Sequence, residues 1–162
     1  MFNNFRIRLY LETTVFNYFF DVERPGHEDV VRLFEVIKAG EIRAYTSRYF
    51  TDELERAQEP KKSKMLSLID EYGIITLDFK EEAVRLAKEY IDEDIIPKSH
   101  LYDSIHVAIS SLHELDIIVS YNFYHINRAK TQRKTSAINS AKGYKSVNIC
   151  TAEEVLEIWS KD

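Results

Sequence analysis

The sequence predicts an α/β fold in which a mainly parallel sheet of about five strands lies between two layers of helices, an α/β/α sandwich. Short apolar runs rich in β-branched residues alternate with helical patterns along the whole chain. Their spacing implies βαβ crossovers, which join parallel strands through helices. The length of 162 residues, with 44% hydrophobic and 30% charged residues, suits one globular domain, which we assign to residues 1–162.

The first half of the chain contains three expected strands, at residues 7–11, 42–46 and 74–77. Thr13 or Thr14 is expected to cap a short helix after the first strand. Residues 25–40 form an amphipathic helix that stops at Gly40. Ser47 caps a helix that ends before Pro60, and residues 61–73 form another.

The second half contains two more strands, at residues 116–120 and 147–150. The helix over residues 78–94 opens with the pattern of a capping box, Asp78 with Glu81, and the last helix opens with Thr151 and Glu154 in the same relation. Between them lies a helix around Asp103. Its apolar stripe, from which Asp103 is excluded, consists of Leu101, Ile105, Ala108, Ile109 and Leu112.

Charge is distributed unevenly. The net charge of −5 argues against general adhesion to nucleic acid. Residues 117–152, however, contain no acid, and we refer to them as the basic window. Either a polyanion site or a solvated surface explains this window equally well. Its cations are Arg128, Lys130, Arg133, Lys134, Lys142 and Lys145.

Cysteine usage and hydropathy indicate a cytoplasmic protein that does not enter a membrane. Cys150 is the single cysteine, so no internal disulfide can form, and no Cys/His spacing of a zinc site is present. The apolar N-terminal stretch is interrupted by Arg6, Arg8, Glu12 and Asp21, which is unlike a signal peptide.

Polar residues stand where the expected strands end. Glu12 follows the first strand, Glu53 lies in the helix after the second, and Asn122 follows the fourth. Asp103 begins the helix that leads into the fourth strand. In parallel sheets, sites form at the carboxyl edge where strand order reverses. Three carboxylates and an amide oxygen there would suit Mg²⁺ or Mn²⁺. Without a cation, each carboxylate pair would repel by roughly 4 kcal/mol at about 4 Å.

Each residue also has a structural interpretation. Glu12 could cap the following helix, and Asp103 could compensate the helix dipole, which stabilises by about 0.3–1 kcal/mol. Asp52 and Glu55 compete with Glu53. Asn122 could end its strand in a turn.

Two histidines lie near the expected site. His106, one turn beyond Asp103, fits a packed histidine better than a ligand, and His125 could contact phosphate. We expect Thr13, Ser120 and His106 to support the ligands without binding the ion.

A divalent ion at this edge would activate water and neutralise phosphate, which together with the basic window points to phosphodiester hydrolysis. Glu12, Glu53 and Asp103 are the expected ligands. Asn122 would orient the attacking water or supply a neutral ligand. The residues expected to hold the RNA backbone are Arg128, Lys130, Arg133 and Lys134.

Six motifs along the chain resemble those of the PIN-domain ribonucleases. "YLETT" (10–14) resembles a "YLETS" first strand, "SYNFYHI" (120–126) an "SWNFKHI" motif, and "AINSAKGY" (137–144) an "N…GY" segment. "YDSIHVAIS" (102–110) resembles a "DALHIA" helix, and "CTAEEVL" (150–156) a closing "SPEEV" segment. "TSRYFTDELERA" (46–57) is similar to the second-strand motif with its helix.

The resemblance implies an α/β/α sandwich and metal-dependent RNA cleavage, with family acids at Glu12, Glu53 and Asp103 and a fourth acidic position at Asn122. Many relatives are toxins held inactive by an antitoxin, often as dimers, so an antitoxin partner and a homodimer are expected. Two residues depart from the pattern. Glu12 replaces the usual Asp, which favours Mn²⁺ or binding through water, and Asn122 is neutral.

Two other functions are weighed against this one. A non-catalytic RNA- or protein-binding module would keep the fold without the metal. A small-molecule phosphatase would need a nucleophilic Asp-x-Asp after the first strand, where this chain has Glu12, Thr13 and Thr14.

Overall fold

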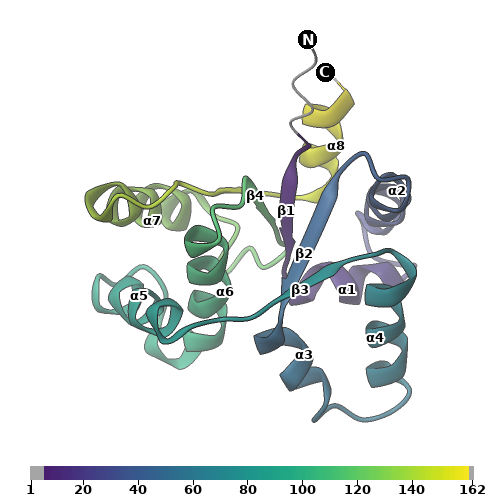
Figure 1. Cartoon of the computed structure of the whole chain (residues 1–162), viewed down its shortest axis with the longest axis horizontal. Coiled ribbons are helices and arrows are strands. Elements are labelled where there is room, and N and C mark those ends of the chain that lie inside the picture. Colours follow the sequence, from purple (N-terminus) through teal and green to yellow (C-terminus); the bar gives the residue numbers. More distant parts are fainter. Residues whose placement is uncertain (1–5, 161–162) are drawn as a thin grey trace.

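The computed structural model describes residues 6–160, which form a five-stranded sheet between two layers of helices (Figure 1). Strand order is β3-β2-β1-β4-β5, and all neighbouring strands are parallel. The predicted fold class is confirmed. The strands are β1 (Arg8–Leu11), β2 (Arg43–Ser47), β3 (Ile75–Leu77), β4 (Ile117–Val119) and β5 (Asn148–Cys150).

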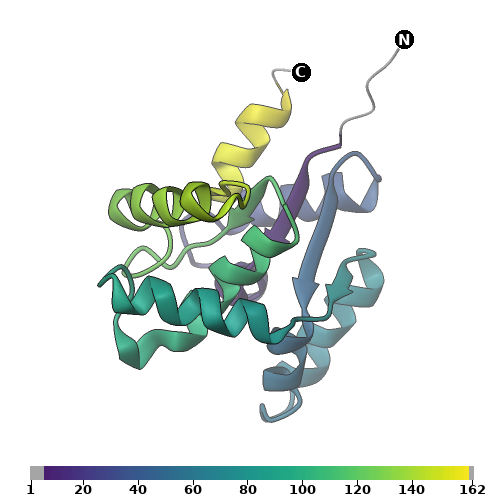
Figure 2. The same ribbon diagram turned by 60° about the vertical axis from the view of Figure 1, so that its left-hand side comes forward.

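Helices cover both faces of the sheet (Figures 1 and 2). One face carries α1 (Thr13–Phe20), α2 (His27–Lys38), α4 (Lys61–Glu71) and α8 (Ala152–Ser160). The other face carries α5 (Glu81–Asp92), α6 (Leu101–Leu112) and α7 (Ala129–Lys142), and the 3-10 turn η1 (Lys98–His100) precedes α6. The short helix α3 (Arg48–Leu54) continues from the carboxyl end of β2.

Alternation along the strands divides the core between these layers. Leu9 and Leu11 of β1 pack into the α2 side, whereas Tyr10 between them packs into the α6 side. All three side chains are fully buried. The two faces of one strand therefore contribute side chains to two separate hydrophobic cores.

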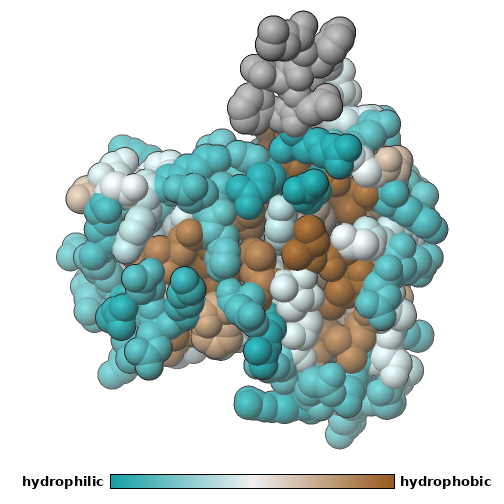
Figure 3. Space-filling model, in the orientation of Figure 1, coloured by the Kyte–Doolittle hydropathy of each residue, from teal (hydrophilic) through white to brown (hydrophobic). Residues whose placement is uncertain are grey.

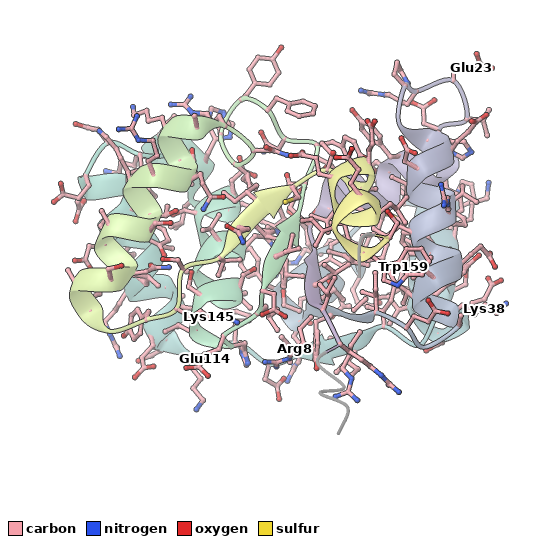
Figure 4. The ribbon with its side chains drawn as sticks, turned by 90° about the horizontal axis from the view of Figure 1, so that it is seen from above. Arg8, Glu23, Lys38, Glu114, Lys145 and Trp159 are labelled. Atoms are coloured by element: carbon pink, nitrogen blue, oxygen red, sulfur yellow. The ribbon has the colours of Figure 1, made fainter. Side chains whose placement is uncertain are left out.

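Strand order reverses between β1 and β4, so the carboxyl ends of these two strands define the edge where a site is expected. In Figure 1 this edge points downward, toward α3. The opposite edge is closed by structural contacts. Arg8 and Lys145 both donate to the carbonyl oxygen of Glu114, at 3.3 and 3.4 Å, and Figure 4 shows the three residues together.

The helix starts agree in part with the sequence expectations. Ser47 caps α3 by accepting from Phe50 N, and Thr151 and Glu154 form the expected reciprocal cap of α8. Two expectations were wrong. Glu12, and neither Thr13 nor Thr14, caps α1. Asp78 forms no cap, because its carboxylate pairs with Arg48 at 3.2 Å and the cap of α5 is Lys80.

Helix α7 was not expected from the sequence, which supplied only the basic window there. Its buried stripe is polar and consists of Thr131, Thr135 and Asn139. These side chains replace apolar packing with hydrogen bonds: Asn139 accepts from the Tyr90 hydroxyl at 2.5 Å and donates to Ser111 Oγ at 2.9 Å. A polar stripe gives no hydrophobic periodicity, and for this reason the sequence pattern did not predict α7.

Hydrophilic residues cover most of the face shown in Figure 3, while hydrophobic residues reach the surface beside the edge strand β3. Ile75 of that strand is 43% exposed. Among residues 6–160, no helix has the length and apolar character needed to cross a membrane.

Candidate metal centre

Glu12 lies directly after β1 at the point of strand reversal and is only 2% exposed. Its Oε2 accepts from Thr14 N at 3.1 Å, from Thr14 Oγ1 at 2.5 Å and from Ser120 Oγ at 3.0 Å. Its Oε1 accepts no hydrogen bond from the part of the chain that the structure describes. One oxygen is therefore fixed by the protein, and the other is available.

Burial raises the pKa of Glu12 to about 7. Hydrogen bonds from Thr14 and Ser120 lower this pKa, and the negative charge of Asp103 raises it further. The acidic group of Asp103 therefore acts on Glu12 across the site. At neutral pH and without a cation, the Glu12 carboxyl is about half protonated, which relieves the repulsion between the two acids.

Asp103 lies in the first turn of α6 and is 8% exposed. Its Oδ2 is 3.3 Å from Nδ1 of His100. The expected apolar stripe is only part of the buried surface, because every residue from 103 to 111 is buried. The reason is that α6 packs against the sheet and, on its other side, against α5.

Glu53 lies near the end of α3 and is exposed. Burial raises the pKa of the Tyr102 hydroxyl, and the nearby carboxylate of Glu53 raises it further. The pKa of Tyr49 is raised by burial and then by the charges of Glu53 and Asp103. The charges of Glu53 and Asp103 therefore both act on one tyrosine, Tyr49. Its competitor Glu55 is occupied by Lys62, at 2.9 Å.

The structure thus places the three predicted acids at one edge but does not bring them equally close. Glu12 interacts with Asp103, and Glu53 reaches the site through Tyr102, whose hydroxyl also lies 2.9 Å from Thr13 Oγ1. Among the described residues, the His, Cys, Asp and Glu side chains that form a group of three with ligand atoms within 4.8 Å of one another are His100, Asp103 and His125.

Asn122 forms a turn. Its Oδ1 accepts from the backbone N–H of His125 at 3.0 Å, and its own N–H donates to Ser120 Oγ at 3.0 Å. Ser120 therefore links the turn to Glu12. The expectation that Asn122 orients a water or binds the ion stays a prediction.

His106 lies behind the acids and is completely buried. Its Nδ1 is 2.5 Å from the Tyr10 hydroxyl, which in turn lies 2.8 Å from Ser47 Oγ. Burial lowers the pKa of His106 to about 3, so the ring is neutral at physiological pH. The rings of Tyr49 and Tyr102 pack edge-on against it. This environment is that of a packed histidine that supports Tyr102 and Tyr49.

The basic window is divided along α7. Arg128 and Lys130, at the start of the helix, line a cavity of about 650 Å³ together with His125. Arg133 and Lys134 follow and are exposed. A helix of 14 residues is about 21 Å long, so the remaining cations lie at the far end.

Those far cations serve structural ion pairs. Lys142 pairs with Glu89 at 2.9 Å, and Lys145 pairs with Asp116 at 2.6 Å. Only the first part of the window flanks the acidic site.

Sequence reasoning missed Thr14, Tyr102 and His100. Thr14 donates two of the three hydrogen bonds to Glu12, Tyr102 connects Thr13 with Glu53, and His100 contacts Asp103. Only Thr14 had a usable signal, since a Thr two residues after a capping acid can bond to that acid. The other two contacts depend on tertiary packing.

The donors present fit a hard divalent ion. The available Oε1 of Glu12 and the carboxylate of Asp103 are oxygen ligands of the kind that Mg²⁺ and Mn²⁺ prefer. Glu53 lies on the exposed side, and in the part of the chain that the structure describes the ligand atoms of Glu12, Glu53 and Asp103 do not all lie within 4.8 Å of one another.

Comparison with known proteins supports the fold. No protein-family model matches the chain, and no curated protein matches it. A similar chain occurs in the crystal structure of VapBC2 from Rickettsia felis bound to a DNA fragment from their promoter. The TM-score is 0.54 at 10% sequence identity, covering 90% of this chain and 98% of that chain. This likeness establishes a shared fold.

Proposed function

We propose that this chain is a PIN-like, metal-dependent endoribonuclease. The observation that carries the proposal is Glu12, a buried acid at the point of strand reversal with one oxygen held by three donors, the other oxygen available, and a pKa that is raised in part by the charge of Asp103. Burying a carboxyl is costly unless its charge is used or compensated. A cation between Glu12 and Asp103 provides that compensation.

In this proposal Glu12 and Asp103 hold Mg²⁺ or Mn²⁺, and Glu53 contributes from α3. The bound ion would activate water and stabilise charge on the phosphate. Thr14 and Ser120 fix the orientation of Glu12, as their hydrogen bonds to Oε2 indicate.

The start of α7 supplies the RNA contacts. Arg128 and Lys130 lie beside His125 around the cavity next to the site, and they would bind phosphates of a single-stranded substrate. Arg133 and Lys134 would extend this contact along the exposed helix surface.

The fold shared with a chain of the VapBC2 complex, together with the PIN-like motifs, supports the further proposal that this chain is the toxin of a toxin–antitoxin pair and acts in the cytoplasm. An antitoxin protein and a second copy of the chain would be its partners.

A non-catalytic RNA-binding module is the second candidate. The observation in its favour is the composition of the site: Asn122 is neutral and its amide oxygen already holds a turn, and Glu53 reaches the site through Tyr102. Both features reduce the negative charge available to an ion.

The deciding experiment measures cleavage of a mixed single-stranded RNA pool with Mn²⁺, Mg²⁺ or a chelator. We expect Asp103→Asn and Glu12→Gln to lower cleavage by at least about 100-fold, because each removes a ligand charge. Mn²⁺ should serve at least as well as Mg²⁺. Asp52→Asn, an exposed change on α3, is the matched control and should cleave like wild type.

Equal cleavage by wild type and Asp103→Asn would refute the proposed site. Retained RNA binding without cleavage in any metal would establish the non-catalytic module instead.

A further inference from the structure

His100, Asp103 and His125 lie together at the start of α6, and they come from two segments. His100 is the N-cap of α6 and Asp103 lies in its first turn, whereas His125 belongs to the turn after β4. One potential ligand atom from each residue lies within 4.8 Å of the other two.

The contact between His100 and Asp103 alone is ordinary. A histidine before a helix and an acid in its first turn commonly interact, and here Nδ1 and Oδ2 are 3.3 Å apart. The third residue is harder to explain. Nδ1 of His125 is buried and has no hydrogen-bond partner among the described residues. A buried nitrogen left unpaired is costly, so its position requires a reason.

We propose that His100, Asp103 and His125 form a site for a first-row divalent ion that accepts imidazole ligands, such as Zn²⁺ or Co²⁺. Imidazole nitrogen suits these ions, whereas Mg²⁺ requires oxygen ligands. The site shares Asp103 with the oxygen-ligand centre at Glu12 but takes its other two ligands from imidazole rings, and it does not depend on ribonuclease activity.

One of the three distances between ligand atoms already matches such a site, and the other two are at most 4.8 Å. Two ligands at the usual ~2.0–2.2 Å from a tetrahedral zinc ion lie roughly 3.4 Å apart. The His100–Asp103 contact of 3.3 Å already has this spacing. The imidazole rings of His100 and His125 have centroids 3.9 Å apart. The side chain of His100 is 45% exposed, so this ligand forms the solvent-facing side of the site.

The surroundings of His125 hold it in place. The backbone N–H of His125 donates to Asn122 Oδ1 at 3.0 Å, and the backbone carbonyl oxygen of His125 accepts from Thr131 Oγ1 at 2.6 Å. These bonds fix the backbone of His125, and with it the position from which the ring enters the site.

The neighbouring cavity of about 650 Å³ gives a hydrated ion access to the site. His125 contributes to its wall. The other charged residues of the wall nearly balance, and they are Asp92, Asp94, Lys98, Arg128 and Lys130.

The test is titration of the tag-free protein with Co²⁺, followed by visible absorption, with Zn²⁺ as competitor. Wild type should bind one Co²⁺ with an absorption band typical of nitrogen ligation, and Zn²⁺ should displace it. His100→Phe and His125→Phe keep an aromatic ring without a ligand atom, and each should weaken binding at least tenfold. Circular dichroism checks that each variant is folded.

The matched control is His113→Phe at the end of α6, where Nε2 of His113 bonds to the Asp78 carbonyl oxygen at 3.0 Å. It should bind Co²⁺ like wild type. Glu12→Gln should lose RNA cleavage yet keep Co²⁺ binding, which separates this proposal from the proposed function. Absence of Co²⁺ absorption in wild type, or an equal loss in His113→Phe, would overturn the proposal.

Discussion

Two buried titratable residues lie close to the site, and their pKa values are shifted in opposite directions. Burial raises the pKa of Glu12 to about 7 and lowers the pKa of His106 to about 3. Both shifts favour the neutral form, as desolvation requires. The folded protein therefore keeps a neutral histidine over a wide pH range and a carboxyl that titrates near neutrality.

These shifts predict how stability depends on pH. Between about pH 4.5 and 6.5 the unfolded chain protonates His106 while the folded protein does not, so this group makes stability rise with pH. In the same interval the folded protein keeps a proton on Glu12 that the unfolded chain has lost, so this group makes stability fall with pH. The two contributions cancel in wild type.

Glu12→Gln should expose the contribution of His106. We expect the free energy of unfolding of this variant to rise by about 1.4 kcal/mol per pH unit more steeply than that of wild type over this interval. Urea unfolding at pH 5 and 6.5, with a chelator present, measures the difference. Parallel pH profiles for the two proteins would show that Glu12 has an ordinary pKa.

The position of a single residue was predictable from the sequence where the order of strands and helices determined it. Glu12 and Asp103 were expected at the carboxyl edge and lie there, because strand ends and helix starts are visible in the hydrophobic pattern. Their partners were not predictable. Whether Asn122 faces the site or closes a turn depends on its side-chain rotamer.

At the scale of elements, the course of α7 decides which cations of the basic window lie near the site and so which of them would contact RNA under the proposed function. The helix begins beside the site and ends at the opposite edge, where Lys142 is paired with Glu89. The sequence shows which residues are charged but not where they lie along a helix. The helix has no apolar periodicity, because its buried residues are Thr131, Thr135 and Asn139.

Replacing Arg128 and Lys130 together by Gln should therefore weaken RNA binding and flatten its salt dependence. The log–log slope should fall by about 0.7 for each phosphate of a single strand that the variant no longer neutralises. The pair Arg133 and Lys134 should show the same effect at a smaller size. Fluorescence anisotropy over a salt series measures the slopes.

Lys142→Gln serves as the control and should leave the slope unchanged, since Glu89 already neutralises this cation. An unchanged slope in the Arg128 and Lys130 variant would mean that the window is a solvated surface.

At the scale of the whole molecule, the fold was predictable because each strand and nearly every helix has its own local pattern, and parallel topology follows from their alternation. The same topology explains the site. Reversal of strand order between β1 and β4 leaves Glu12 and Ser120 side by side, with a hydrogen bond of 3.0 Å, although they are 108 residues apart.

The central claim is that Glu12 and Asp103 together hold a divalent ion at this reversal. The most direct test is the anomalous X-ray signal of Mn²⁺ in crystals of the tag-free protein. We expect a peak within ligand distance of Glu12 Oε1 and of a carboxylate oxygen of Asp103. A map without such a peak, or one with a peak at His100 and His125 only, would contradict the claim.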